Sequence, residues 1–402
     1  MTDKPKLKQT EVGMIPSDWE VKTLGELVDM SSGTTPSRFN EKNFQGNVCW
    51  LSSGELKSHY IYNTKEKISE DAASSMRLYP KGTVVIAMYG LEAEGVRGTS
   101  SILAKECTIS QACMAFTNLR EINNEYFYYW YAANGNEIGT KYAQGTKQQN
   151  LSPEVMKNVI IPLPPTIEEQ QRIANALSDV DTLIANLEKL IAKKKNIKQG
   201  AMQQLLTGKK RLPGFAPAKP TYKQTELGKI PTDWEVKNVG KLLKIGHGRD
   251  YKNLKSGNVP VYGTGGYMTS VNDCLYDGET VCIGRKGTID KPFYHTGKIW
   301  TVDTLFYTYG FNNCNPKFIY YAFCLVDWFA MNEASGVPSL TSKNIEDVLL
   351  RIPSSKAEQT AIANILSDMD TEISALETKL AKYRTLKTGM MQQLLTGKVR
   401  LK

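Results

Sequence analysis

Apolar residues recur along residues 166–208 at alternating intervals of four and three positions, with polar residues between them. This spacing places the apolar side chains on one stripe of a helix, and it predicts a long helix that packs against another helix. The stripe consists of Ile173, Leu177, Val180, Ile184, Leu187 and Ile191. Thr166 and Glu169 form a T-x-x-E capping box at the predicted start. Gly208 stands where a helix commonly ends in a left-handed residue.

The whole pattern occurs a second time, 189 positions later. Residues 169–212 align without a gap on residues 358–401, and 27 of the 44 pairs are identical. Ser355 and Glu358 repeat the cap, and the second stripe consists of Ile362, Leu366, Met369, Ile373, Leu376 and Leu380. A single copy is equally compatible with a helix that packs only on its own domain. Two copies with the same stripe and the same MQQLLTGK end favour pairing of the two helices with each other.

A second repeat, with a different offset, lies at the start of each half. Residues 8–27 return as residues 223–242, 215 positions later, and 14 of the 20 pairs are identical. The chain is therefore read as two copies of an arm, a variable domain and a long helix. The predicted segments are an arm and first domain over 1–165, a helix over 166–208, a linker over 209–222, a second arm and domain over 223–354, and a helix with its tail over 355–402.

The two variable stretches are each predicted to be a small mixed domain of short strands with a helix. The strand-like runs are 48–52, 83–88 and 108–116 in the first, and 259–262, 280–283 and 300–307 in the second. Residues 121–133 and 316–328 are predicted helices. The expected fold class is α+β, with two such domains joined by two long antiparallel helices that form an intramolecular coiled coil with an internal pseudo-two-fold repeat.

Composition narrows the class of protein. The formal net charge of +9 is a modest excess that points weakly to a polyanionic partner. The seven cysteines contain no C-x-x-C pair and the three histidines are scattered, which favours reduced packing cysteines in a cytoplasmic protein and predicts no metal site. The first residues lack the apolar core of a secretion signal, and no apolar run is long enough to span a bilayer.

The order of arm, variable domain and helix, repeated twice and joined by the IPLPP…EQ…I junction, resembles the specificity subunit of type I restriction–modification systems. The resemblance covers nearly the whole chain. It implies two target recognition domains that each read one half of a split, asymmetric DNA site, and two helices that fix the distance between them. It also implies a non-catalytic subunit that docks two modification subunits, which methylate adenine, and restriction subunits in larger assemblies.

The repeat itself favours antiparallel helices, because parallel helices would crowd both domains at one end. A helix of this length spans roughly 60 Å, or about 18 base pairs of duplex, so the helices are expected to set the length of an unread spacer. Lysines are frequent in the second half of the first helix. They are interpreted as a solvated surface or, alternatively, as contacts to phosphates over the spacer.

Base contacts are expected from polar turns of the two variable domains, since arginine, lysine, asparagine and glutamine make bidentate contacts to base edges. The stretches are 52–60, 89–99 and 141–149 in the first domain, and 247–252, 262–267 and 285–288 in the second. The candidate residues are Ser53, Lys57, His59, Tyr89, Arg97, Lys141, Lys147, Gln148, His247, Arg249, Lys252, Tyr262, Thr264, Tyr267, Arg285 and Lys286. For each of them the alternative is a polar surface residue of a loop.

The sequence offers no sign of catalysis or of a bound cofactor. It contains neither the P-loop pattern nor a G-x-G-x-x-G loop between a strand and a helix. Asn315-Pro316-Lys317-Phe318 departs from the D/N-P-P-Y/F segment of an adenine methyltransferase at its third position. The paired aspartates at 179, 181, 368 and 370 are interpreted as helix-surface or partner contacts. The alternative function is a DNA-binding scaffold that self-associates through its helices and ignores sequence.

Overall fold

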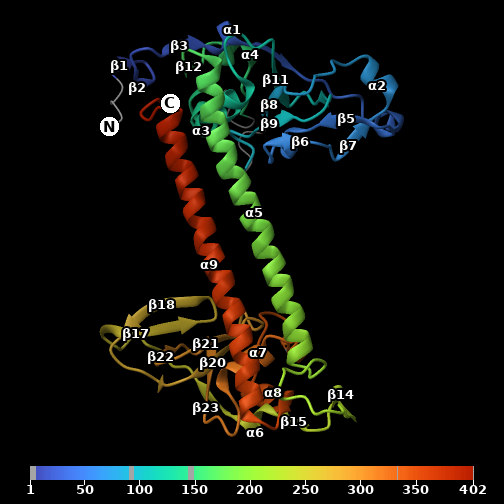
Figure 1. Ribbon diagram of the computed structural model, residues 1–402, viewed down its shortest axis with the longest axis vertical. Helices are drawn as coiled ribbons and strands as arrows, with labels where there is room; N and C mark the ends of the chain where they lie inside the picture. Colours follow the sequence, from blue (N-terminus) through green and yellow to red (C-terminus); the bar gives the residue numbers. More distant parts are fainter. Residues whose placement is uncertain (1–5, 90–94, 144–148, 333, 402) are drawn as a thin grey trace. The chain divides into compact units, whose positions relative to one another are not determined.

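The computed structural model describes residues 6–89, 95–143, 149–332 and 334–401. The chain divides into two compact units: unit 1 contains Met1–Leu187 and Lys379–Lys402, and unit 2 contains Glu188–Thr378. The two long helices are α5 (Ile167–Leu205) and α9 (Lys356–Leu394). Each unit therefore contains one end of each long helix (Figure 1).

Unit 1 begins with a β-hairpin and continues into a mixed domain. Its strands are β1 (Leu7–Thr10), β2 (Gly13–Pro16), β3 (Glu20–Thr23), β4 (Asp29–Ser32), β5 (Val48–Leu51), β6 (Tyr60–Ile61), β7 (Glu66–Ile68), β8 (Val84–Ala87), β9 (Ser100–Leu103), β10 (Thr108–Ile109), β11 (Cys113–Thr117) and β12 (Ile160–Leu163). Its shorter helices are α1 (Leu24–Leu27), η1 (Glu41–Phe44), η2 (Ser53–Glu55), α2 (Glu70–Ser74), α3 (Asn124–Tyr142) and α4 (Pro153–Lys157). The larger sheet has the order β4-β11-β8-β9-β6, and a smaller one has the order β10-β5-β7.

Unit 2 follows the same plan with shorter connections. Its strands are β13 (Tyr222–Thr225), β14 (Gly228–Pro231), β15 (Trp234–Asn238), β16 (Lys244–His247), β17 (Ser256–Gly263), β18 (Gly266–Val271), β19 (Tyr276–Asp277), β20 (Thr280–Gly284), β21 (Phe293–His295), β22 (Lys298–Thr301), β23 (Leu305–Tyr309) and β24 (Leu349–Pro353). Its shorter helices are α6 (Val239–Leu242), α7 (Pro316–Phe323), η3 (Phe329–Met331) and α8 (Ser342–Asp347). Two four-stranded sheets, β16-β23-β20-β21 and β18-β17-β22-β19, form its domain. The α+β class predicted from the sequence is confirmed.

The ends of the long helices are only partly as predicted. The Thr166 hydroxyl accepts a hydrogen bond from the Glu169 amide at 3.2 Å, which is half of a capping box. The Glu169 carboxylate does not reach back to the cap residue but binds the Arg400 guanidinium. An ion pair with a guanidinium offers this carboxylate a stronger partner than a neutral amide does. At the other end, Gly208 has a φ of 71°, which is the predicted left-handed conformation.

The long helices run antiparallel within each unit. In unit 1, the Lys387 ammonium of α9 lies 2.6 Å from the Asp181 carboxylate of α5. In unit 2, the Lys198 ammonium of α5 lies 2.5 Å from the Asp370 carboxylate of α9. In unit 1, Glu169 pairs with Arg400 and Asp181 pairs with Lys387. Residue numbers therefore rise along α5 as they fall along the second partner segment. The antiparallel pairing predicted from the repeat is confirmed in both units.

The predicted stripe serves two kinds of packing. Ile173 and Leu177 belong to the core of unit 1, together with Leu394 and Leu395 at the end of α9. Ile362 and Leu366 belong to the core of unit 2, together with Leu205 and Leu206. The remaining stripe residues, Val180, Ile184, Leu187, Ile191, Met369, Ile373, Leu376 and Leu380, are buried or half-buried. The first turns of each long helix thus pack on a domain and on the partner helix at once.

Each arm packs on the end of the long helix that reaches its unit. Trp19 and Trp234 are fully buried. The Cβ position of Gly397 lies 3.1 Å from the Trp19 ring, and that of Gly208 lies 3.4 Å from the Trp234 ring. A side chain at either glycine would also press on a proline ring. The arm tryptophans therefore have a packing role within their own unit.

A buried glutamine joins each domain to its long helix. Gln170 of α5 accepts a hydrogen bond at 2.7 Å from the amide of Asn123, the residue that caps α3, and it donates to the Pro164 carbonyl at 3.3 Å. Unit 2 repeats this arrangement with Gln359, Asn315 and Pro353. Because both glutamines are almost inaccessible to water, these hydrogen bonds have no competition from solvent.

Candidate nucleic-acid interface

Two runs that were predicted to be single strands are each broken by a turn. Residues 108–116 form β10 and β11, and residues 300–307 form the end of β22 and the start of β23. β10 pairs in parallel with β5, and β22 pairs in parallel with β17, whereas β11 and β23 belong to other sheets. The chain must therefore turn between sheets at 109–112 in unit 1 and at 301–304 in unit 2. We call these two turns the loop junctions.

Three of the predicted DNA-contact stretches meet at the loop junction of unit 2. Four backbone hydrogen bonds hold them there: Arg249 N–H to Thr301 O (2.8 Å), Val302 N–H to Tyr262 O (3.0 Å), Arg285 N–H to Thr304 O (2.8 Å) and Leu340 N–H to Arg285 O (2.9 Å). Stretches up to some forty residues apart in sequence thus share one small surface. The backbone fixes that surface whatever side chains the loops carry.

Unit 1 has the same junction, bond for bond. The equivalent hydrogen bonds are Thr34 N–H to Ile109 O (3.0 Å), Ser110 N–H to Leu51 O (2.8 Å), Met88 N–H to Ala112 O (2.9 Å) and Leu151 N–H to Met88 O (2.9 Å). Isolated bridges between Tyr89 and Asn150 and between Lys286 and Ser339 also correspond. The two domains are therefore one framework with different loops.

A glycine makes the first of these loops possible in each unit. A Cβ on Gly33 would lie 2.0 Å from the Ile109 carbonyl oxygen, and one on Gly248 would lie 1.9 Å from the Val302 carbonyl oxygen. Only glycine allows the backbone to approach so closely. A tryptophan then fixes the next residue, because the Trp50 indole donates to Thr34 O at 3.0 Å and the Trp300 indole donates to Arg249 O at 2.9 Å.

The candidate residues of unit 2 divide into exposed and restrained side chains. His247, Arg249, Lys252, Tyr267 and Lys286 are exposed around the loop junction. Tyr262 and Thr264 are half-buried, with the Tyr262 ring 5.2 Å from the Phe293 ring. The Arg285 guanidinium donates to the Asp303 carbonyl at 3.2 Å, so it supports the junction.

His59 of unit 1 belongs to a half-buried aromatic cluster. Its ring stacks on the Tyr128 ring at 4.0 Å, and its Nε2 lies 2.8 Å from the Glu125 carboxylate. The Tyr60 hydroxyl donates to the same carboxylate at 2.5 Å. Burial raises the pKa of Glu125, but the hydrogen bonds from His59 and Tyr60 outweigh this and leave it below its ordinary value. His59 and Tyr60 thus connect the start of β6 to Tyr128 and Glu125 of α3.

The other candidates of unit 1 are spread over its loops. Arg97 is half-buried against the end of α3, where it donates to Thr140 at 3.3 Å and to Gln149. Tyr89 and Lys141 are exposed, and the Lys141 ammonium lies 5.0 Å from the Tyr142 ring. Ser53 is half-buried at the start of η2, and Lys57 is exposed after it. Lys147 and Gln148 lie outside the described residues.

The sequence reasoning missed one loop of unit 1. Residues 34–40 leave the junction as residues 249–254 do in unit 2, but only the second loop was predicted to contact DNA. The signal was present, because Gly33 and Gly248 are separated by the 215 positions of the arm repeat. Extending that repeat by six residues would have paired the two loops.

Three lysines of the long helix α5 form ion pairs with the other long helix, while Lys189 and Lys193 are exposed. Lys194, Lys195 and Lys198 lie 2.6, 2.7 and 2.5 Å from the carboxylates of Glu372, Glu377 and Asp370 on α9. These ion pairs hold the two helices together within unit 2. Asp181 and Asp370 are also engaged by the hydroxyls of Tyr129 and Tyr321, at 2.9 and 2.8 Å.

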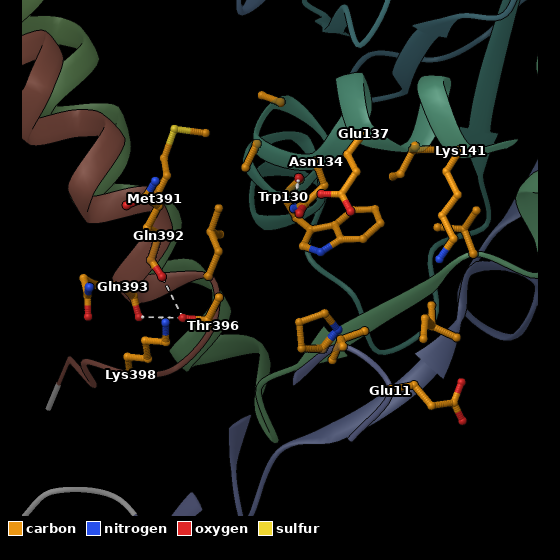
Figure 2. Close-up of a pocket in the computed structure, with 18 of the residues that line it drawn as sticks. Glu11, Trp130, Asn134, Glu137, Lys141, Met391, Gln392, Gln393, Thr396 and Lys398 are labelled. Carbon is orange, nitrogen blue, oxygen red and sulfur yellow. Dashed lines mark hydrogen bonds between the residues drawn. The ribbon is translucent and has the colours of Figure 1, made fainter. Parts of the chain in front are cut away.

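Each unit contains a groove at the end of a long helix. The groove of unit 1 has a volume of about 820 Å³ and lies between the end of α9, helix α3 and the arm. Figure 2 shows Gln392, Gln393 and Lys398 on one side, with Trp130, Asn134 and Glu137 of α3 opposite them. The groove of unit 2, about 420 Å³, is lined by repeat-equivalent residues, which include Leu206 for Leu395, Leu227 for Val12, Leu349 for Ile160 and Val326 for Asn134.

The described residues contain neither a cluster of metal ligands nor a helix that could span a membrane. Among them, no group of three or more His, Cys, Asp or Glu side chains is placed to hold a metal ion. Over the same part of the chain, no helix has both the length and the apolar character of a membrane span. All seven cysteines are free thiols, and burial raises the pKa of Cys107 to about 12, so this thiol stays protonated.

The repeated framework matches a known family. A family model described as "Type I restriction modification DNA specificity domain" matches residues 16–199 and 231–382, one match for each half of the repeat. The chain belongs to this family of type I specificity subunits.

Relatives of this specificity subunit match it over different shares of their length. The type I restriction enzyme MjaVIII specificity subunit of Methanocaldococcus jannaschii is 23% identical over 96% of this chain and 94% of its own length. The MjaIX specificity subunit of the same organism is 29% identical, but the match spans 60% of this chain and 56% of that relative. The chain therefore spans little more than half of the second relative.

Solved structures support the fold of the specificity subunit. The crystal structure of a type I restriction–modification S subunit from M. genitalium has a TM-score of 0.64, with 19% sequence identity, and the match covers 97% of this chain and 98% of that one. A chain from a study of complex assembly and conformational transition in the type I system has a TM-score of 0.57 with 15% identity, and covers 96% of this chain. At these identities the likeness concerns the fold alone.

Proposed function

We propose that this specificity subunit reads a split DNA site, with one half-site contacted by the loops of unit 1 and the other by the loops of unit 2. The observation that carries this proposal is the pair of equivalent loop junctions with unequal side chains. Equal frameworks provide the same mode of approach to DNA, whereas unequal loops provide different sequence preferences. A duplicated reader with two different surfaces therefore favours an asymmetric, bipartite target.

The chain's role is to bind DNA and leave chemistry to other subunits. The exposed candidate residues around the loop junction of unit 2 are His247, Arg249, Lys252, Tyr267 and Lys286, whose cations and ring hydroxyl suit contacts to phosphates and base edges, although Asp250 and Asp303 are exposed there too. The buried acids Glu169 and Glu358 are occupied by guanidinium groups. Adenine methylation would be performed by modification subunits, with restriction subunits added in a larger complex.

The test is methylome sequencing of a host that expresses this chain together with its modification subunit. The proposal predicts adenine methylation at one motif made of two short defined halves and an undefined spacer. An unsplit motif, or methylation without sequence preference, contradicts it. The alternative of a DNA scaffold without specificity predicts affinity that falls steeply with salt and does not change between DNA sequences.

We further propose that two copies of one modification subunit dock on the repeated surfaces at the ends of the long helices. Packing accounts for identity at the buried positions of MQQLLTGK, such as Leu205 and Leu394. It does not account for identity at exposed positions, which are Gln203, Gln204 and Lys209 in one copy and Gln392, Gln393 and Lys398 in the other. The same exposed residues next to equivalent grooves suit two copies of one partner.

Stoichiometry tests this docking proposal. Native mass spectrometry of the purified complex should give one specificity subunit for two modification subunits. Replacing Gln392 and Gln393 with glutamate should remove one copy and leave the other, whereas Gln203 and Gln204 remain unchanged as the internal control. An equimolar wild-type complex would contradict the proposal.

A further inference from the structure

The loop of residues 34–40 in unit 1 projects one apolar side chain fully into solvent. Phe39 is fully exposed, although it lies in a well-anchored loop. A single exposed ring is unremarkable by itself, so its meaning depends on how and where it is held.

The two residues before Phe39 have contacts with the rest of unit 1. The Arg38 guanidinium makes two hydrogen bonds to the Glu66 carboxylate, at 3.0 and 2.8 Å, and lies 4.4 Å from the Phe44 ring. The Ser37 carbonyl accepts a hydrogen bond from the Asn43 side chain at 2.9 Å. These contacts anchor the loop beside Phe39, whose ring points into solvent, while Arg38 stays exposed in a surface ion pair with Glu66.

This loop starts from the same point of the framework as the loop of Arg249 in unit 2. Thr34 and Arg249 make the same backbone hydrogen bond to their loop junction and accept the same indole hydrogen bond. The unit 2 loop presents the cations Arg249 and Lys252 to solvent, whereas the unit 1 loop presents the Phe39 ring beside Arg38, which is paired with Glu66. If both junctions face DNA, these loops meet it in equivalent positions with different chemistry.

We infer that Phe39 is a specificity-determining residue of unit 1 that contacts the methyl group of a thymine in its half-site. An aromatic ring cannot donate or accept the hydrogen bonds that distinguish guanine, cytosine and adenine in the major groove, but it packs well on the thymine methyl group. The contact rests on the proposed function, since it requires that unit 1 reads a half-site. It adds a base preference and a residue that the sequence patterns did not indicate.

The test combines a protein change with a DNA change in the assembled modification complex. Once the methylated motif is known, each thymine of both half-sites is replaced by deoxyuridine, which lacks only the methyl group. The wild-type complex should lose affinity about fourfold at one thymine of one half-site, the effect of removing one buried methyl group. The Phe39→Ala complex should bind the natural site at least about fourfold more weakly and show no further loss at that deoxyuridine.

Controls separate this inference from the proposed function. Phe329→Ala removes another exposed ring, on η3 of unit 2, and should leave the affinity and the deoxyuridine effect unchanged. A wild-type complex without a split motif would contradict the proposed function itself. With a split motif present, the inference is overturned if Phe39→Ala binds as wild type does, if its affinity still falls at the same deoxyuridine, or if it fails to assemble with the modification subunit.

Discussion

Arg211 and Glu358 form a bidentate ion pair within unit 2: the Arg211 Nε lies 2.5 Å from the Glu358 Oε1, and Nη2 lies 2.8 Å from Oε2. The two side chains are only 7% and 2% exposed. The repeat supplies the same pair in unit 1 with the roles of the halves exchanged, because Arg400 from the second half binds Glu169 from the first. In each unit, an arginine from one half of the repeat therefore binds a glutamate from the other half.

The first prediction concerns this ion pair. Glu358→Gln leaves the Arg211 guanidinium with Asp233, whose side chain is 53% exposed, as its remaining carboxylate partner, and should lower the free energy of unfolding by about 1.5–3 kcal/mol, the range for a hydrogen bond to a charged group. Glu169→Gln should cost less, because the Arg400 side chain is 26% exposed. Denaturant unfolding of the full chain measures both. The exposed pair of Glu235 and Lys237 is the control, and a loss from Glu235→Gln as large as that from Glu358→Gln would contradict the argument.

The second prediction concerns the acid sensitivity of unit 1. The pKa of Glu125 in the folded protein lies below its ordinary value of 4.5, so its charged form stabilises the fold above that pH. This contribution is lost as the pH falls from the ordinary value through the folded value. Glu125→Gln should therefore flatten the pH dependence of stability between about pH 5 and pH 3. An unchanged slope in denaturant unfolding over this range would show that the carboxylate has no such role.

A third prediction follows from contacts between the two ends of the chain in unit 1. Arg400 donates to the Asp18 carboxylate at 2.9 Å, and Leu401 packs on the core that contains Ile15. Joining the natural ends and opening the chain at residues 216–219 should give a permutant that folds and binds DNA as the natural chain does. Opening it inside α5 at residue 192 should abolish folding. DNA binding by the second permutant, or its absence in the first, would contradict this closure.

The proposed role of the helices in spacing gives a fourth prediction. Seven residues inserted after Leu187 in α5 and after Thr378 in α9 keep the helix faces nearly in register. They lengthen each helix by about 10.5 Å, or about three base pairs of duplex. The methylated motif should keep both halves and gain about three undefined base pairs. A spacer of unchanged length would contradict this role, and the same insertion in α5 alone is a control that should prevent assembly.

The sequence was sufficient to predict the repeated elements, because the residue patterns that indicate them are local and occur twice. The apolar stripe, the cap residues and Gly208 predicted two long helices whose observed bounds, Ile167–Leu205 and Lys356–Leu394, differ from the prediction by a few residues. Antiparallel pairing followed from the repeat. The second half of the capping box was wrong, since no local pattern reveals that Glu169 has a partner 231 residues away.

The candidate interface was harder to predict because loops of unequal length interrupt it. The offset between equivalent residues falls from 215 at Thr34 to 189 at Leu151, so no ungapped alignment connects the two junctions. Turns inside apolar runs were also invisible, as in residues 108–116. His59 was a plausible DNA contact by residue type, but its ring is stacked and its nitrogen bound to Glu125, which only the fold reveals.

The central claim is that each unit reads its own half-site, and Arg249 of unit 2 tests it most directly. Methylome sequencing should compare the complex of the natural chain with complexes that contain Arg249→Gln or, as a control on the exposed surface of α8, Lys343→Gln. The account predicts that Arg249→Gln alters or relaxes base preference in one half of the motif and leaves the other half and the spacer as they were. A change in both halves, or a motif identical to that of the natural chain, would contradict it.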